Sequence, residues 1–332
     1  MNMLLLCIIG LLEEFKFKKS NFIMKNKSIY MSVVIPVYGC DESLVKLHNR
    51  LEKTLISIGK SYEIIFVDDC SNEDSWKIIK EISENYSSVY GLKLSRNFGQ
   101  HVAITAGLEK SIGDWIVIMD CDLQDKPEEI VKLYETSQKG VDIVFAQRSN
   151  RQDSYSKKMY SKLFYKVLGY LTDTQLDASV ANFGIYHRKV IDAVLSMGEV
   201  HKYFPIMVRW VGFTTKSIPV SHADRVHGNT TYSLKKLLAL SLNTIISFSD
   251  KPLRLIIKYG FMVSLLSAIY ATSIIVDVVI NGSVVAGWSS MMVSLWFIVG
   301  MLMSVIGVVG LYVGKTFDEA KSRPIYIIKD AS

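Results

Sequence analysis

The chain has few cysteines for its 332 residues, and their spacing excludes two kinds of site. Only four are present, Cys7, Cys40, Cys70 and Cys121, and no two of them form a C-x-x-C pair. Structural zinc sites and the disulfide frameworks of small secreted domains need paired or densely spaced cysteines. We therefore expect four reduced, intracellular thiols.

The sequence also lacks the motifs of several large enzyme classes. It contains no G-x-S-x-G, Walker A or G-x-G-x-x-G pattern, so hydrolase and dinucleotide-binding functions have little support. The formal net charge is only +6, and the basic residues are not interleaved with aromatic ones along one face. A nucleic-acid groove would need that interleaving, so we expect no nucleic-acid partner.

Charged residues are scarce, at 21% of the chain against 49% hydrophobic ones, and the apolar excess lies toward the C-terminus. Two charge-free stretches there, 259–276 and 278–314, predict transmembrane helices at about 256–279 and 290–313. Basic residues flank both outer ends and none lies in the connecting loop. The positive-inside rule therefore predicts a multi-pass protein of the cytoplasmic membrane, with its N-terminal domain and tail in the cytoplasm. The flanking basic residues are Lys251, Arg254 and Lys258, then Lys315, Lys321 and Arg323.

Three further segments surround the expected domain and helices. We expect residues 1–30 to be an extension outside the fold, because their apolar start is too short to span a bilayer and lacks the features of a secretory signal. Residues 231–255 contain an amphipathic helix at 233–248, which either lies on the bilayer surface or packs in the globular core. The tail, 315–332, ends in a short predicted strand at 324–328.

Between residues 31 and 230, apolar β-branched runs alternate with helical periods. We expect strands at 32–38, 63–67, 89–94, 115–119, 141–146 and near 182–187, with helices at 42–58, 73–85, 100–111 and about 154–171. This alternation is typical of an α/β domain with a mostly parallel sheet covered on both faces. Ligands bind such sheets at the carboxyl ends of the strands, and two of those ends carry acidic pairs, Asp68-Asp69 and Asp120/Asp122.

The second acidic end, M-D-C-D-L-Q-D at 119–125, has two interpretations. As a solvated turn, it would place Asp125 at the N-cap of a helix beginning near Pro127, with Glu128 completing a capping box. As a metal site, it would hold Mg²⁺ or Mn²⁺ through the oxygen ligands Asp120, Asp122 and Gln124. The turn explains Asp125 but leaves Asp120 at the strand end unexplained, so we favour the metal site.

Five motifs, in this order, carry a resemblance to a known family. They are V-I-P-V-Y (34–38), V-D-D-C-S (67–71), S-R-N-F-G-Q (95–100), M-D-C-D-L-Q-D (119–125) and S-F-S-D-K-P-L-R (247–254). Together they resemble family-2 glycosyltransferases of the GT-A fold, in the polyprenyl-phosphate branch of bactoprenol glucosyltransferases and dolichol-phosphate mannose synthases. The resemblance implies a metal-dependent, inverting transfer from a nucleotide-sugar, expected to be UDP-linked, to undecaprenyl phosphate for cell-surface polysaccharide synthesis. It also implies a homo-oligomer, in which the tail strand would pair with a neighbouring subunit.

The resemblance also implies roles for individual residues. The nucleotide-sugar would be bound by Pro36, Tyr38, Glu42, Asp68 or Asp69, Arg96 and Asp120. The acceptor phosphate would be bound by Arg148, Lys158 with Ser161, and Arg225, with His227 as a further candidate. Asp122 would act in catalysis through the cation that neutralises the diphosphate leaving group.

Two departures from the family pattern leave the acceptor chemistry open. Where the family shows R-x-x-G-x-S-K, this chain ends the motif in Thr231, so a lysine contact is absent or comes from Lys235. Where bactoprenol glucosyltransferases carry an acid, this chain has Asn182, which cannot accept a proton. Either Asp177 acts as the base, or none is needed because the acceptor phosphate is already anionic. Extension of a lipid-linked or polymeric saccharide, which would need that base, and a non-catalytic membrane scaffold are the alternatives.

Overall fold

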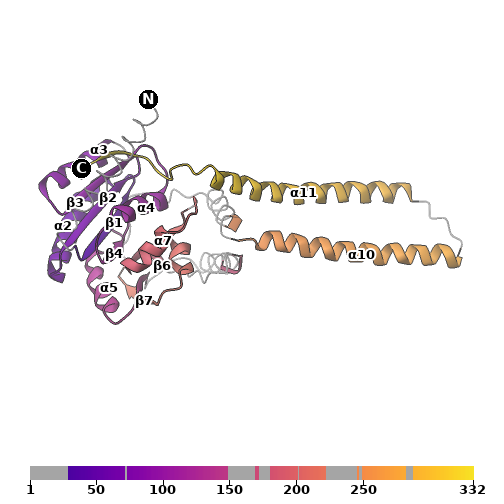
Figure 1. The fold of residues 1–332 in the computed structure, drawn as a ribbon, viewed down its shortest axis with the longest axis horizontal. Coiled ribbons are helices and arrows are strands. Elements are labelled where there is room, and N and C mark those ends of the chain that lie inside the picture. The colour runs from indigo at the N-terminus through magenta and orange to yellow at the C-terminus, as the bar shows by residue number, and fades with distance from the viewer. Residues whose placement is uncertain are drawn as a thin grey trace, which may run out of the picture.

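The structure is a computed structural model that describes residues 29–71, 73–148, 169–171, 180–200, 202–221, 245–246, 249–281 and 287–332. Its strands form one eight-stranded sheet in the order β7-β5-β6-β4-β1-β2-β3-β8 (Figure 1). The strands are β1 Met31–Val37, β2 Tyr62–Asp68, β3 Val89–Leu94, β4 Trp115–Ile118, β5 Ile143–Arg148, β6 Val180–His187, β7 Thr215–Val220 and β8 Ile328–Ala331. The helices are α2 Asp41–Ile58, α3 Glu73–Asn85, α4 Gln100–Lys110, the 3₁₀ helix η2 Pro127–Glu129, α5 Ile130–Ser137, α7 Arg188–Leu195, α8 Phe204–Trp210, α10 Lys251–Asn281 and α11 Trp288–Ala320.

The sheet is mostly parallel, as the sequence predicts. Strand β1 pairs in parallel with β2 and β4, β2 with β3, and β5 with β7. Strands β6 and β8 run antiparallel to their neighbours. The carboxyl ends of β1, β2, β3, β4 and β5 therefore lie at one edge of the sheet.

Helices cover both faces of this sheet, which explains why its central strands are continuous apolar runs. All seven residues of β1 are buried. Val33 and Ile35 pack in a core with α2, α3 and α5, whereas Val34 packs on the opposite face with α4, α7 and α8. Helix α4 lies very close to β1, because a Cβ on Gly107 would lie 2.4 Å from Val34 Cγ1.

The C-terminal tail forms a strand that pairs within its own chain, and the predicted bounds of that strand, 324–328, are wrong; its pairing with a neighbouring subunit stays a prediction. The strand lies at Ile328–Ala331 and runs antiparallel to β3, at the edge of the sheet. Trp76 Nε1 donates to Asp330 Oδ2 at 3.2 Å, and the Tyr326 hydroxyl donates to Glu109. The tail covers an edge strand whose backbone groups would otherwise be open to solvent or to another chain.

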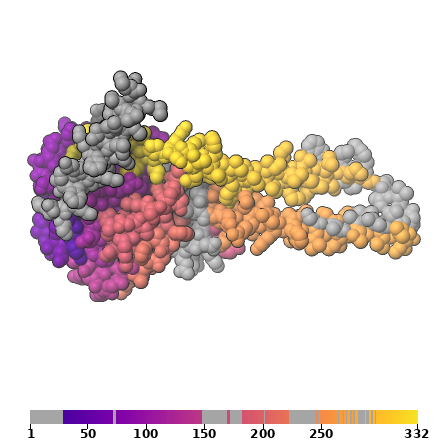
Figure 2. Space-filling model, in the orientation of Figure 1, coloured from indigo at the N-terminus to yellow at the C-terminus, as the bar shows by residue number. Residues whose placement is uncertain are grey.

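Helices α10 and α11 project together from the domain as a two-helix stalk (Figures 1 and 2). They cover the residues of the two expected spans and extend beyond them at both ends. Among the described residues, one helical stretch, Phe297–Ala320, is long and apolar enough to cross a membrane, so the two transmembrane helices stay a prediction. At the base of the stalk the Tyr312 hydroxyl of α11 donates to the Ser249 carbonyl at 2.8 Å. Most of the amphipathic helix expected at 233–248 lies outside the described residues.

Candidate active site

The residues expected to bind the nucleotide lie at or near the carboxyl ends of neighbouring parallel strands. Pro36 is buried in β1 opposite Val67, and Tyr38 follows the strand with 63% of its surface exposed. Asp68 ends β2, in register with Val37. Glu42 is exposed in the first turn of α2. The structure thus brings these expected residues to one region of the sheet edge.

Asp68 and Asp69 are both buried but make different contacts. Asp69 Oδ1 accepts from the Phe98 amide at 2.7 Å and Oδ2 from the Gly99 amide at 2.8 Å. Burial raises the pKa of Asp69, and these two hydrogen bonds oppose the shift. Asp68 Oδ1 accepts from the Ser71 amide at 2.9 Å, while Oδ2 is enclosed without a hydrogen-bond partner in the described part of the chain.

Asp69 therefore anchors the loop that follows β3, a role the sequence did not reveal. That loop contains Arg96, which is exposed and whose guanidinium carbon lies 4.3 Å from the centroid of the Phe98 ring. Gly99 ends the loop with a φ of 98°, a conformation that favours glycine. The contacts of Asp69 fix where the chain carrying Arg96 turns back into α4.

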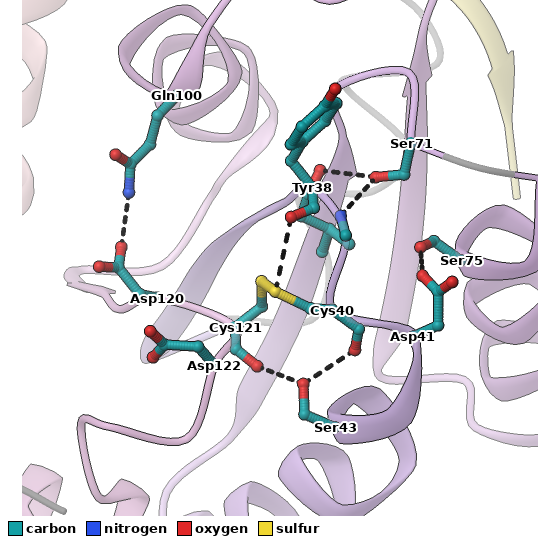
Figure 3. Close-up of a disulfide and its surroundings, with 12 residues drawn as sticks. Tyr38, Cys40, Asp41, Ser43, Ser71, Ser75, Gln100, Asp120, Cys121 and Asp122 are labelled. Atoms are coloured by element: carbon teal, nitrogen blue, oxygen red, sulfur yellow. Dashed lines mark hydrogen bonds between the residues drawn. A yellow bond between two sulfur atoms is a disulfide. The ribbon is translucent and has the colours of Figure 1, made fainter. Parts of the chain in front are cut away.

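In the D-x-D segment, M-D-C-D-L-Q-D at 119–125, the three expected metal ligands share the same degree of burial. From Met119 to Asp125, burial alternates strictly: the odd-numbered residues are buried and the even-numbered ones, Asp120, Asp122 and Gln124, are half-buried. Gln100 Nε2 donates to Asp120 Oδ1 at 2.7 Å (Figure 3). The backbone N–H of Gln124 donates to Asp122 Oδ1 at 3.1 Å.

These side chains fit a hard divalent cation. Two carboxylates and an amide oxygen form an oxygen-only donor set, and Mg²⁺ or Mn²⁺ typically completes such a set with water and substrate phosphates. Within the described residues, no group of three His, Cys, Asp or Glu side chains forms a closed metal site. The arrangement suits a cation shared with a substrate better than a structural ion.

The capping box predicted for this segment is wrong. Lys126, not Asp125, occupies the N-cap of η2, and no side chain makes a cap hydrogen bond there. Asp125 is instead buried, with 2% of its surface exposed. Glu128 forms two hydrogen bonds with the Arg50 guanidinium, at 2.8 and 2.6 Å, and these lower the pKa of Glu128. A partner from a distant helix has replaced the local contact.

The expectation of four reduced thiols is also wrong for one pair. Cys40 and Cys121, which are 81 positions apart in sequence, form a disulfide with 6.0 Å between their Cα atoms (Figure 3). The pairing arises because β1 and β4 are neighbours, so the residues after them converge. The Ser43 hydroxyl joins the same two loops, 2.8 Å from the Cys40 carbonyl and 2.6 Å from the Cys121 carbonyl.

The residues expected at the acceptor side are only partly described. Asn182 lies in β6, two residues before Gly184, which pairs with Ile118 at the end of β4. Arg148 ends β5, at the same edge of the sheet as the D-x-D segment. The other expected residues, Asp177, Lys158, Ser161, Arg225 and His227, lie outside the described residues.

A basic cavity at the base of the stalk was not predicted. It has a volume of about 210 Å³ and is lined by Tyr170, Asp250, Lys251, Arg254, Leu255 and Lys258. Arg254 pairs with Asp250 at 2.7 Å, and the Lys251 ammonium lies 4.4 Å from the centroid of the Tyr170 ring. The sequence indicated that these cations flank an apolar helix, but not that they share a cavity.

Comparisons with known proteins place the chain among enzymes of one family. The model of glycosyl transferase family 2 matches residues 32–195. The undecaprenyl-phosphate 4-deoxy-4-formamido-L-arabinose transferase of Proteus mirabilis is 34% identical over 304 residues, 90% of this chain and 93% of that protein. The prophage bactoprenol glucosyl transferase homolog of Escherichia coli is 34% identical over 300 residues, 90% of this chain and 98% of that protein. A crystal structure of Mycobacterium tuberculosis glucosyl-3-phosphoglycerate synthase with Mn²⁺, UDP and phosphoglyceric acid has a TM-score of 0.46 and 16% identity, covering 66% of this chain and 77% of that one.

Proposed function

The chain belongs to glycosyl transferase family 2, and we propose that it transfers a sugar from a nucleoside-diphosphate sugar to a polyprenyl phosphate at a membrane surface. The observation that carries the proposal is the set of acidic side chains at one edge of the sheet. Asp68 is the last residue of β2, and Asp120 and Asp122 follow β4. This edge is where α/β sheets bind nucleotides.

Of the two neighbouring acids, Asp68 is the better candidate for contacting the nucleotide. Both carboxylate oxygens of Asp69 are occupied by loop amides, whereas Asp68 Oδ2 has no hydrogen-bond partner among the described residues. An N–H of the base or a ribose hydroxyl would supply that partner. Tyr38, which is exposed just after β1, would stack on the base, and Arg96 would contact the nucleotide from the loop after β3.

Asp120, Asp122 and Gln124 would hold a Mg²⁺ or Mn²⁺ ion, which when bound would neutralise the diphosphate leaving group. Gln100 would fix the orientation of the Asp120 carboxylate through its 2.7 Å hydrogen bond. An ordered carboxylate loses less entropy when it binds, which favours the bound state.

The acceptor phosphate would attack the anomeric carbon as the bond to the diphosphate breaks. A phosphate is already ionised near neutral pH, so the protein need not remove a proton from it. This would account for an amide, Asn182, where bactoprenol glucosyltransferases carry an acid. A hydroxyl acceptor would instead need a base, for which Asp177 is the candidate in this region of the sequence.

The stalk fits a lipid acceptor. Large apolar side chains such as Phe261, Leu265 and Phe297 are more than half exposed along its helices, as suits contact with acyl chains. We infer that α10 and α11 both span the cytoplasmic membrane, with the 31–230 domain, the 231–255 segment and the 315–332 tail on its cytoplasmic side. The basic cavity where α10 begins would then lie at headgroup level, where Lys258 could meet an anionic lipid phosphate.

A transfer assay with the purified full-length protein tests this function. It combines Mn²⁺ or Mg²⁺, a panel of labelled nucleotide-sugars, and either undecaprenyl phosphate or a saccharide acceptor. We expect label in a lipid product that mild acid releases. Transfer only to the saccharide would support chain extension instead, and no turnover with any donor would support a non-catalytic scaffold.

A further inference from the structure

The sulfur pair Cys40–Cys121 lies inside the candidate donor site. Cys121 is the middle residue of the D-x-D segment, between Asp120 and Asp122. Cys40 ends the loop that carries Tyr38 and directly precedes α2. The bond therefore connects the segment expected to meet the diphosphate with the loop expected to meet the base.

We propose that Cys40 and Cys121 are a reversible redox modification site, whose oxidised form orients the D-x-D carboxylates for a metal–nucleotide complex. The orientation part rests on the proposed function. Cytoplasmic disulfides are usually transient and redox-sensing, which fits a pair on the cytoplasmic side of a membrane enzyme. Cys70, the other described cysteine, has a free thiol.

The geometry explains how the bond would act on the neighbouring carboxylates. The Cys121 side chain is buried, with 6% of its surface exposed, and the disulfide holds it on the inner side of the segment. Asp120 and Asp122 lie on the opposite side of Cys121, away from the disulfide (Figure 3). Fixing the middle side chain inward restricts the backbone rotations that would turn either carboxylate away from the site.

The two loops are also joined by contacts other than the sulfur bond. The Ser43 hydroxyl contacts both cysteine carbonyls, and the Met119 amide donates to the Val34 carbonyl at 3.2 Å. Reduction should therefore loosen the D-x-D segment without separating it from β1. This predicts a graded change in ligand affinity, and not a loss of the fold.

The exchange chemistry balances with a small-molecule disulfide such as oxidised glutathione. Cys40 is the half-buried member of the pair and Cys121 the more enclosed one, so the Cys40 thiolate attacks first. It forms a mixed disulfide and releases one glutathione thiolate. The Cys121 thiolate then attacks the Cys40 sulfur and releases the second, so two protein thiols are oxidised as one glutathione disulfide is reduced.

The test sets the full-length protein in detergent to defined ratios of reduced and oxidised glutathione. Alkylation followed by intact mass gives the fraction of the bonded pair, and electron paramagnetic resonance of free Mn²⁺ in the presence of UDP gives the binding affinity. We expect the reduced protein to bind Mn²⁺–UDP about 3- to 10-fold more weakly, the range for losing the preorganisation of one side chain. The double variant Cys40→Ser/Cys121→Ser should match the reduced protein in every buffer, and Cys70→Ser should keep the redox response.

The order of attack has its own readout. In Cys121→Ser, one glutathione should remain attached to Cys40, whereas Cys40→Ser should acquire far less at the enclosed Cys121. Thiols that stay reduced in every glutathione buffer would overturn the modification site. Equal Mn²⁺–UDP affinity in the two redox states would overturn the orienting role, and no Mn²⁺–UDP binding in either state would overturn that role together with the proposed function, while alkylation still reports on the sulfur pair.

Discussion

Replacing Asp69 with Asn should destabilise the protein, although the substitution changes the side-chain shape very little. The two Asp69 oxygens accept from two part-buried backbone amides, at 2.7 and 2.8 Å. An Asn side chain keeps one acceptor and turns an NH₂ group toward the other amide. One charge-assisted hydrogen bond is lost and a buried donor is left unsatisfied, which costs about 2–4 kcal/mol.

The neighbouring Asp68 provides a matched control with the opposite expectation. Asp68 Oδ1 accepts from the Ser71 amide, and an Asn oxygen can accept the same bond. The free energy of unfolding of Asp68→Asn should therefore lie within about 1 kcal/mol of that of the unmodified protein. Its UDP affinity should nevertheless fall about tenfold or more if this carboxylate contacts the nucleotide.

Thermal unfolding of the two variants in detergent, with UDP titrations beside it, separates these roles. A cost of 2–4 kcal/mol corresponds to a melting temperature lower by roughly 5–15 °C for a domain of this size. Only Asp69→Asn should show that shift. If Asp69→Asn melts like the unmodified protein, or Asp68→Asn loses as much stability, the division of roles between the two acids is refuted.

Other parts of the structure give three further expectations. Asp122→Ala should reduce sugar transfer by at least about 100-fold with little change in melting temperature, and full activity would contradict the metal assignment. Burial lowers the pKa of His101 from 6.5 to about 4. Between pH 6.5 and pH 4, His101 takes up a proton in the unfolded state but not in the folded state. The free energy of unfolding, followed by denaturation midpoints, should therefore fall by at most about 3 kcal/mol as the pH falls through this range. His101→Gln should abolish this loss. Deleting residues 326–332 removes the β8 pairing and the Trp76–Asp330 contact and should cost about 2–4 kcal/mol in thermal melts; unchanged melting would contradict pairing within the chain.

The sequence predicted the central sheet well because buried parallel strands have a strong local signal. Strand β3 begins and ends at the predicted residues, 89–94. Strands β1 and β2 differ from their predictions by one residue at each end, and β4 by one residue at its C-terminal end. Continuous β-branched runs between helices leave few alternatives. Once the strands are parallel, the convergence of Asp68 and Asp120 at one edge follows from topology alone.

Contacts between loops could not be predicted, because they depend on strand order and on loop geometry. The disulfide needs β1 beside β4, and no local pattern connects Cys40 with Cys121. The burial of Asp125 depends on a turn in which Leu123 has a φ of 61°. That turn cannot be recognised in the sequence, so the short spacing from Asp125 to Pro127 and Glu128 suggested a helix cap instead. The tail does contain a short strand, as predicted, but neither the exact residues of β8 nor its partner strand could be predicted from an apolar run.

The proposed transfer of a sugar to polyprenyl phosphate can be tested by the stoichiometry of a single reaction. The full-length protein would be incubated with Mn²⁺, undecaprenyl phosphate and the nucleotide-sugar that it uses, and both the nucleoside diphosphate and the lipid-linked sugar would be quantified by mass spectrometry. We expect one sugar to be attached to lipid phosphate for each nucleoside diphosphate released, with its anomeric configuration inverted. Release of nucleoside diphosphate without a sugar-phospholipid, or with the sugar attached to a saccharide, would contradict it.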